Sequence, residues 1–211
     1  MEQEVLQITI AKISAISALA GSVIGALATL ASTWLARRMQ EKGSISIFCR
    51  LVASVPDGKE FGIYQSGSGS GLIMRVPMWI EVCNTSGISR FVRDVNVVGC
   101  IGKKEVCEFI QFQGNNLGKE NEILYGDNQA YTFVVEANST KRFQCEFAIK
   151  QYDLPEESRL IDSLSIRYYD EKNKKHVNQF YKITDNPVWS IRRFDYKKQW
   201  FEASKKKRKM L

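Results

Sequence analysis

The feature that most limits what this chain can fold into is residues 13–36, a run of 24 residues without a charge. Lys12 precedes it, and Arg37 and Arg38 follow it. A helix of that length extends about 36 Å, enough to cross a hydrocarbon layer of about 30 Å. The run contains no proline, so a helix can satisfy its own backbone hydrogen bonds in lipid. The sequence therefore predicts one N-terminal transmembrane helix, with its flanks, over residues 1–42.

Two other interpretations of this run stay open. The large side chains, with Ala20 filling one gap, recur at a 3-4-3-4 spacing, which a soluble or bundle-forming helix would also show; they are Ile13, Ile16, Val23, Leu27, Leu30 and Trp34. The opposite face carries Gly, Ala, Ser and Thr instead of the long polar residues of a soluble helix, which favours lipid. A cleaved signal peptide is the third interpretation, but it would have a shorter apolar core and a cleavage site.

The small-residue face predicts self-association. Gly21 and Gly25 form a GxxxG motif, and Ser17 and Thr29 extend it at the same four-residue step. In lipid, helices associate where small residues let their backbones approach closely. We therefore expect a homo-oligomer formed through Ser17, Gly21, Gly25 and Thr29.

The flanking charges predict the orientation of the helix. One basic residue precedes the run and three follow it, since Lys42 comes after the two arginines. By the positive-inside rule the N-terminus lies outside an inner membrane and the rest of the chain is cytoplasmic. Five cysteines without a CxxC pair agree with this, because a reducing cytosol leaves an odd number of thiols free.

The chain's excess positive charge lies at its C-terminal end. The formal net charge is +7, and residues 188–211 hold nine Lys or Arg against Asp195 and Glu202. This basic tail also carries aromatic residues. The predicted contacts to anionic lipid or nucleic acid are Trp189, Arg192, Arg193, Lys197, Lys198, Trp200, Lys205, Lys206, Lys207, Arg208 and Lys209.

Lipid is the favoured partner of the basic tail, because the predicted span keeps a bilayer within reach. Lys and Arg are drawn to an anionic leaflet, while Trp enters the interface. Pairing with nucleic-acid phosphates and stacking on bases is an alternative, and a disordered solubilising end is another.

Between the span and the basic tail, apolar residues alternate with a period of two, which is typical of strands. Strands are expected over 44–53, 60–65, 72–83, 91–100, 105–113, 131–135, 143–149, 164–169 and 177–183, with a short helical turn in 154–160. Pro77 suggests an edge or a bulge in its strand. Short strands with regular turns predict a cytoplasmic antiparallel β-sandwich over residues 43–187, in a mainly β chain.

One short segment resembles a known structural family. It runs from Val82 through Asn84, Thr85 and Gly87 and continues over 92–95. It is similar to a strand–turn–strand found in Ig-like sandwiches of bacterial single-pass membrane proteins. The resemblance implies an Ig-like fold for the β-sandwich and implies no activity.

Motifs for catalysis or for a cofactor are lacking in the sequence. There is no HExxH, GK[ST] or GxGxxG motif and no Cys or His pair at zinc spacing. His176 is the one histidine, and its neighbours suggest a surface position rather than a catalytic arrangement. We therefore expect a protein that is not an enzyme and binds no cofactor or metal.

These expectations combine into one function and one alternative. The first is a non-enzymatic, membrane-anchored interaction protein: an accessory subunit, sensor or effector at the cytoplasmic face, for instance in bacterial stress or phage defence. Its partners would be membrane lipids, further copies of the chain and an unidentified protein. The alternative is a soluble subunit of an assembly, whose basic tail binds nucleic acid.

Overall fold

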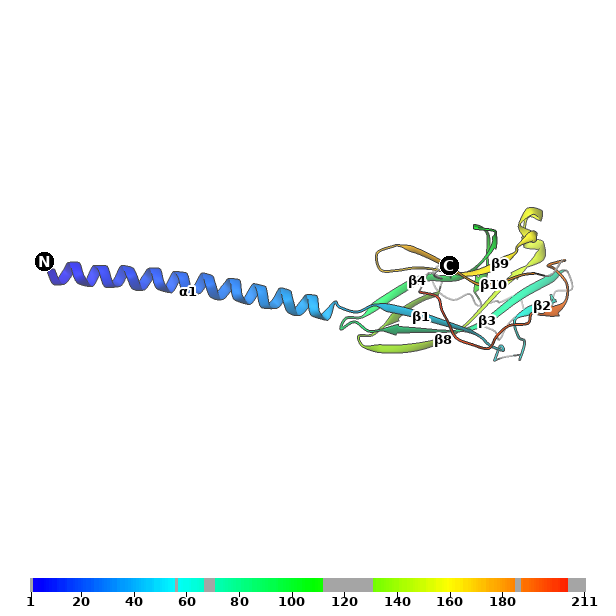
Figure 1. Cartoon of the computed structure of the whole chain (residues 1–211), viewed down its shortest axis with the longest axis horizontal. Coiled ribbons are helices and arrows are strands. Elements are labelled where there is room, and N and C mark those ends of the chain that lie inside the picture. The colour runs from blue at the N-terminus through cyan, green and yellow to red at the C-terminus, as the bar shows by residue number, and fades with distance from the viewer. Residues whose placement is uncertain (1, 56, 67–70, 112–130, 185–186, 205–211) are drawn as a thin grey trace, which may run out of the picture. The chain divides into compact units, whose positions relative to one another are not determined.

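The computed structural model describes residues 2–55, 57–66, 71–111, 131–184 and 187–204 (Figure 1). After Gly43 the chain divides into two compact units, an N-terminal helix and a β domain. Each unit forms its own internal contacts. The prediction of a mainly β chain with one long apolar helix at its start is confirmed.

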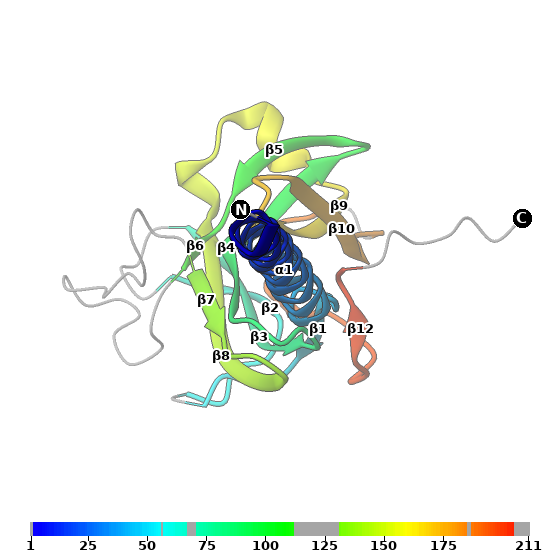
Figure 2. The same cartoon turned by 90° about the vertical axis from the view of Figure 1, so that its left-hand side faces the viewer.

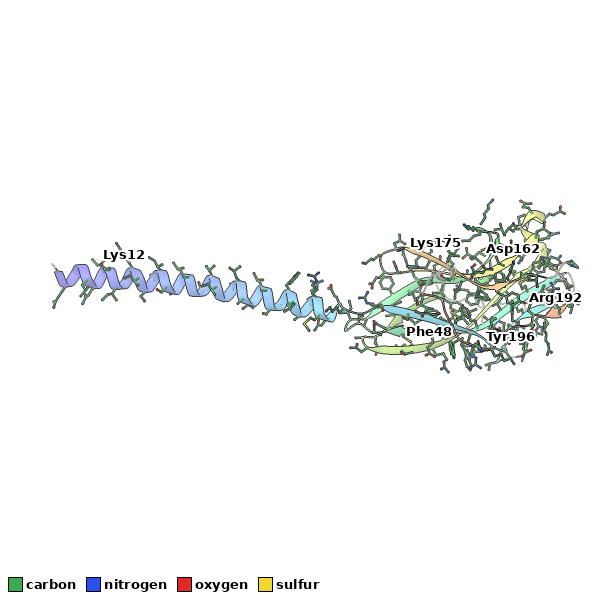
Figure 3. The ribbon with its side chains drawn as sticks, viewed as in Figure 1. Lys12, Phe48, Asp162, Lys175, Arg192 and Tyr196 are labelled. Carbon is green, nitrogen blue, oxygen red and sulfur yellow. The ribbon has the colours of Figure 1, made fainter. Side chains whose placement is uncertain are left out.

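Helix α1 covers Glu2–Gln40 as one continuous element. Its part from Leu6 to Gln40 is long and apolar enough to cross a membrane. The large apolar side chains described on α1 are 54% to 67% exposed, and Figure 3 shows the side chains projecting all around the ribbon. Within the helix unit, no described residue covers this apolar surface.

The larger sheet is antiparallel and centred on β3 (Leu72–Asn84). β8 (Ser139–Lys150) pairs along one edge of β3. Along the other edge of β3, β2 (Gly62–Gln65) pairs with the first part of the strand and β1 (Ile45–Leu51) with the later part. Three short strands complete the sheet. β11 (Arg192–Arg193) pairs with β2, β12 (Phe201–Glu202) pairs with β1, and β6 (Ile110–Gln111) pairs with β8.

The smaller sheet is also antiparallel and is built on β4 (Arg90–Ile101). β9 (Ser163–Tyr169) pairs with β4, and β10 (Lys175–Lys182) pairs with β9. β7 (Tyr131–Val135) pairs with the first part of β4, and β5 (Lys104–Glu108) pairs with its last part. Two 3-10 turns, η3 (Gln151–Asp153) and η4 (Glu156–Leu160), precede β9.

The two sheets share one hydrophobic core. Every second residue of their strands faces it, because successive side chains of a strand alternate between faces. Figure 2 looks along the β domain, with β9 and β10 in one layer and β1 and β3 in the other. Fully buried members include Ile47, Val76, Met78, Ile80, Val95, Val97, Leu164 and Ile166. Burying each such side chain contributes about 1.5–3 kcal/mol.

Pro77 lies inside the central strand of the larger sheet, where the sequence suggested an edge or a bulge. Its carbonyl accepts a hydrogen bond from the N–H of Val52 at 3.2 Å, so the backbone there faces the side of β1 and β2. The β2 ladder ends at Arg75 and the β1 ladder starts at Met78. The donor that proline lacks therefore falls between two ladders, and β3 remains continuous.

The described part of the basic tail belongs to the β domain. β11 pairs with β2 and β12 with β1. Phe194 is 5% exposed and Ala203 is fully buried. Residues 187–204, here called the C-terminal segment, therefore pack against the sheets, whereas the sequence analysis set residues 188–211 apart from the domain.

A buried ion pair holds a turn against the larger sheet. Arg75 is 1% exposed, and its Nη2 donates to Glu146 Oε2 at 2.9 Å. Its Nη1 donates to Asp57 Oδ2, and the Ser54 hydroxyl donates to Glu146 Oε1 at 2.6 Å. Arg75 of β3 lies opposite Ala148 of β8, and Glu146 of β8 lies opposite Pro77 of β3. The turn that carries Ser54 and Asp57 is thus fixed to the sheet by charge-assisted hydrogen bonds.

Candidate functional site

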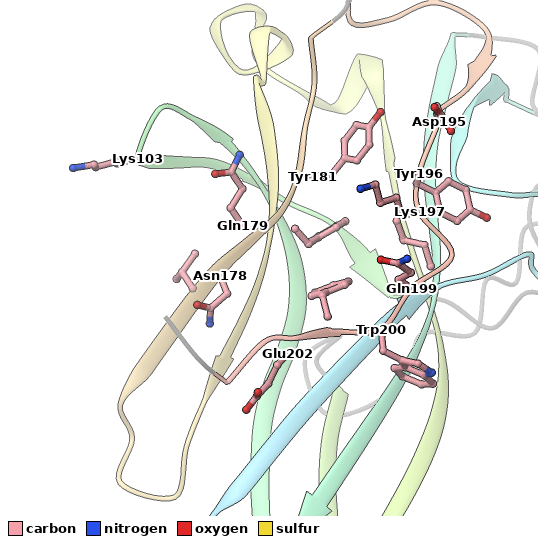
Figure 4. A pocket seen from close by; sticks show the side chains of 14 residues that line it. Lys103, Asn178, Gln179, Tyr181, Asp195, Tyr196, Lys197, Gln199, Trp200 and Glu202 are labelled. Atoms are coloured by element: carbon pink, nitrogen blue, oxygen red, sulfur yellow. The ribbon is translucent and has the colours of Figure 1, made fainter. Parts of the chain in front are cut away.

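The described β domain has a groove between β10 and the C-terminal segment, with a volume of about 1230 Å³ (Figure 4). Its lining comes from four parts of the chain that are distant in sequence. The lining residues are Leu51, Lys103, Val177, Asn178, Gln179, Phe180, Tyr181, Asp195, Tyr196, Lys197, Gln199, Trp200, Phe201 and Glu202.

The groove arises because both sheets end there. β10 is the last strand of the smaller sheet and β12 is the last strand beside β1 in the larger one. The Asn178 side chain donates to the carbonyl of Ala203 and so joins the two edges at one end of the groove. The β9–β10 ladder is irregular between Gln179 and Tyr181, two of the residues that line the groove.

Aromatic rings form the floor and one wall of the groove. The rings of Phe180 and Phe201 stack with centroids 5.6 Å apart. Tyr181 packs edge-on against Phe61 at 4.8 Å, and Phe194 packs against the same phenylalanine at 4.6 Å. These contacts anchor the C-terminal segment to the core and give the groove a rigid apolar base.

The polar groups of the groove carry no net charge. Lys103 and Lys197 are balanced by Asp195 and Glu202, and three amide side chains add donors and acceptors: Asn178, Gln179 and Gln199. An apolar floor with a few polar groups is typical of a binding site, and amides pair readily with a peptide backbone. Burial, followed by the charge of Glu60, raises the pKa of Tyr196, so this phenol stays neutral.

The predicted contact residues of the C-terminal segment have partners inside the domain. Trp189 is half-buried, and its Nε1 donates to the Arg159 carbonyl at 3.0 Å. Arg192 donates to the carbonyls of Pro187 and Val188. These side chains stabilise the segment's own turn.

Two further cations of this segment pair with one carboxylate. Lys198 Nζ lies 3.1 Å from Glu60 Oε1, and Arg193 Nη1 lies 3.8 Å from Glu60 Oε2. Trp200 has its ring 6.5 Å from that of Trp79. Lys197 lines the groove. The remaining predicted contacts, Lys205, Lys206, Lys207, Arg208 and Lys209, lie outside the described residues.

The small-residue face of α1 is open. A Cβ atom added to Gly21 or Gly25 would meet no atom within 4 Å. The Thr29 hydroxyl donates to the Gly25 carbonyl at 2.8 Å, and Ser22 donates to Leu19 at 2.8 Å. Ser17 is exposed on the same helix. The hydroxyl groups of Ser22 and Thr29 thus find acceptors within the helix, as a helix in lipid requires.

His176 is the second residue of β10 and lies opposite Tyr168 of β9, next to the turn that joins the two strands. Its Nε2 lies 2.8 Å from Asp170 Oδ2, and its ring stacks on Tyr168 at 4.8 Å. Both contacts shape the hairpin. In the described part of the chain, no group of three or more His, Cys, Asp or Glu side chains is arranged to hold a metal ion.

The groove residues Asn178, Gln179 and Tyr181 were not predicted from the sequence. Their strand was predicted, but no local pattern shows which other strand end will face it. A partial signal was the pair Phe194 and Tyr196, whose two-residue spacing suits a strand rather than a helix.

Comparison of the chain with protein-family models, with curated proteins and with solved structures gives no match.

Proposed function

We propose that this protein is a non-enzymatic, membrane-anchored interaction protein. The observation that carries the proposal is the surface of α1, on which the described large apolar side chains are at least 54% exposed. In water each 1 Å² of such surface costs about 25 cal/mol, whereas lipid removes this cost. The internal hydrogen bonds of Ser22 and Thr29 suit the same environment.

The proposed orientation leaves the N-terminus outside an inner membrane and the β domain in the cytoplasm. Arg37 and Arg38 in the last turn of α1 support this orientation through the positive-inside rule. The free thiols of all five cysteines suit a reducing compartment. The β domain itself is proposed to be an Ig-like β-sandwich, supported by its two antiparallel sheets and their shared core.

The groove is the proposed site for a protein partner, and its occupant is an extended peptide segment. β10 is paired with β9 along one edge, and the groove follows its other edge. A segment added there would gain main-chain hydrogen bonds, with Asn178, Gln179 and Gln199 as further partners. The balanced charges of the lining favour a segment without a strong net charge.

Self-association of α1 is proposed through Ser17, Gly21, Gly25 and Thr29. Because a side chain at Gly25 meets nothing in one helix, Gly25→Leu should leave the single helix intact. It should abolish crosslinked dimers in membranes if this face packs against a second copy. Ala20→Leu, on the large-residue face, is the matched control and should keep them. Equal dimer yields in both variants would contradict the proposed interface.

Lipid contact by the basic tail is proposed for Lys205–Lys209, where cations would be drawn to an anionic leaflet. In the described C-terminal segment, Arg192, Arg193 and Lys198 already have partners inside the domain, which supports a structural role for them. This layout suits an accessory subunit, sensor or effector at the membrane, for instance in bacterial stress or phage defence.

Fractionation tests the anchor. The full chain should remain in the membrane pellet after carbonate and high-salt washes and enter solution only with detergent. A control lacking residues 2–40 should be soluble. Release of the full chain by salt or by nuclease would overturn the anchor and favour the alternative, a soluble subunit that binds nucleic acid.

Site-specific photo-crosslinking tests the groove in the membrane-bound chain. A photoreactive residue at Gln179 should yield a protein adduct, whereas one at Thr132, exposed on β7 outside the groove, should not. The adduct at Gln179 should disappear when Tyr181→Ala and Trp200→Ala remove the groove's aromatic lining. Equal adducts at both positions, or an adduct that survives these substitutions, would exclude the groove as the partner site.

A further inference from the structure

The turn between β9 and β10 presents two lysines from a fixed backbone. Asp170 Oδ1 accepts hydrogen bonds from the backbone N–H groups of Lys172 and Lys174, each at 2.9 Å, while Oδ2 contacts His176. Asn173 takes a φ of +58°, which asparagine tolerates better than most residues. Partial burial would raise the pKa of Asp170, but these hydrogen bonds outweigh it, so its pKa lies below the ordinary value.

This hairpin lies at the end of the β domain where the chain enters it (Figure 1). Ser44, the first residue of the domain, exchanges backbone and side-chain hydrogen bonds with Thr85 at 3.0–3.1 Å. The neighbouring Ser86 accepts a hydrogen bond from Arg90 Nε at 2.8 Å. Arg90 is in turn ion-paired with Glu171 of the hairpin. A continuous series of contacts therefore joins the entry point to the lysine-bearing turn.

Three cations at this end are not neutralised. Arg90 and Lys141 are paired with Glu171 and Glu136, respectively. By contrast, the exposed side chains of Lys172, Lys174 and Arg93 form no ion pair with any described residue, and Arg93 instead donates to Asn173. Lys175, which follows Lys174, is paired with Glu105, and Figure 3 shows it at this end of the β domain.

Exposed apolar residues lie beside these cations. Phe91 and Val134 face each other in the register of β4 and β7, and they are 41% and 61% exposed. Arg93 follows Phe91 two residues later on the same strand, so both project from the same face of the sheet. Cations that flank an exposed aromatic ring form the pattern by which proteins contact the headgroup region of a bilayer.

We propose that this hairpin-tip surface, formed by Lys172, Lys174, Arg93, Phe91 and Val134, contacts anionic lipid headgroups. The proposal rests on the proposed function, because it requires that α1 crosses the membrane. Four peptide steps separate Gln40, the end of α1, from Ser44, and they span at most about 14 Å. An anionic bilayer surface is therefore within reach of this end of the domain, and the contact is independent of the basic tail.

The far end of β3 supplies an internal control. β3 ends at Asn84, beside Thr85 at the entry point, and Arg75 lies nine residues earlier in the same strand, roughly 30 Å away. Arg75 binds Asp57 in the turn that carries the exposed Lys59. That separation exceeds the screening length of about 8–10 Å at physiological salt, so one bilayer surface would not act on both ends.

Lysine acetylation of the full chain in lipid nanodiscs tests the proposal. The discs contain phosphatidylcholine alone or with added phosphatidylglycerol, and mass spectrometry measures the rate at each lysine. In the anionic discs Lys172 and Lys174 should react about fivefold more slowly than in neutral ones, since a lysine near such a surface gains about 1 kcal/mol. High salt should restore the rate. Lys59 should react equally in both kinds of disc.

The outcomes separate this proposal from the one on which it rests. If the chain fails to enter the discs, the anchor itself is disproved. If it enters them and Lys172 and Lys174 react at the same rate in both lipids, the anchor stands and the hairpin-tip surface is excluded. If Lys172 and Lys174 are acetylated slowly, but at equal rates, in neutral and anionic discs, the bilayer covers them without recognising their charge. This result would also exclude the hairpin-tip surface as a site for anionic lipid.

Discussion

The helix and the β domain use the same kinds of side chain in opposite ways. Leu27 and Leu30 of α1 are 60% and 67% exposed, whereas Leu164 of β9 is fully buried. The β domain removes its apolar surface from water by folding, whereas the candidate span in α1 is not buried. Under the proposed function a membrane would supply the apolar environment of α1, while the domain forms its own core.

The two units also differ in where their hydrogen bonds go. In α1 they run to residues three or four positions away, as from Thr29 to Gly25. In the β domain they join strands far apart in sequence, as between β1 and β12. The structure of α1 is therefore locally determined, and that of the domain depends on strands finding one another.

Placing a charge in α1 should have the largest effect on where the protein is found in the cell. Val23→Arg puts a cation near the middle of the apolar run, at a cost of about 2.5–3.5 kcal/mol for insertion. We expect most of the protein to leave the carbonate-resistant membrane fraction. Met39→Arg, at the end of the same helix, is the control and should be retained. Equal retention of both variants would mean that α1 is not surrounded by lipid.

Breaking the buried ion pair should be the most damaging change in the β domain. Arg75→Met leaves Glu146, which is 4% exposed, without its partner and should cost about 3–5 kcal/mol of unfolding free energy. Urea denaturation measures the loss. The double variant Arg75→Met with Glu146→Leu should recover most of it. A double variant as unstable as the single one would show that the buried charge is not the cause.

Arg75 also sets part of the acid sensitivity, through its contact with Asp57. Partial burial would raise the pKa of Asp57, but hydrogen bonds from Arg75 and the Lys59 backbone outweigh it and lower this pKa. A lowered native pKa gives stability that is present above the unfolded value near 4 and is lost as pH falls through the native value. Unfolding free energies measured from pH 6 downward should fall less steeply in Arg75→Met than in the native sequence.

A matched pair of truncations tests the contrast between the units directly. Leu164→Ala should destabilise the β domain by about 2–5 kcal/mol, because it leaves a cavity in a filled core. Leu27→Ala makes the same chemical change on α1 and should leave the domain's urea midpoint unchanged. Tryptophan fluorescence follows the transition. A shifted midpoint in Leu27→Ala would show that the two units unfold together.

The smallest effect is expected in the C-terminal segment. Phe194→Ala should cost about 2 kcal/mol, below the usual range for a buried phenylalanine, because strands of only two residues hold this segment. Ile191→Ala, at a side chain that is 65% exposed, should stay within about 0.5 kcal/mol of the native value. Equal, negligible changes in both variants would mean that the segment does not belong to the cooperative unit.

Local sequence patterns predicted most strands but not their partners. All nine predicted strands correspond to observed ones, because alternating apolar residues are needed wherever one face of a strand is buried. The range 105–113 divides into β5 and β6 around Phe109, which bonds to Val97 instead of continuing the ladder. β8 starts at Ser139, earlier than expected, because its pairing with β3 continues through polar residues.

The groove and the C-terminal strands could not be predicted in this way. β11 and β12 have two residues each, too few to show a period. Their cations and aromatics indicated a surface contact, but Phe194 and Trp189 pack into the domain. The groove exists because β10 and β12 both end their sheets, and this arrangement depends on the three-dimensional order of strands.

The pairing of β12 with β1 has a consequence for the order of events during synthesis. About 150 residues separate Leu51 of β1 from Phe201 of β12. β1 therefore cannot pair with β12 until nearly all of the domain has been translated. α1 needs no distant segment and emerges first. If α1 enters a membrane as proposed, its insertion can precede closure of the domain, and the nascent chain would be tethered before its groove exists.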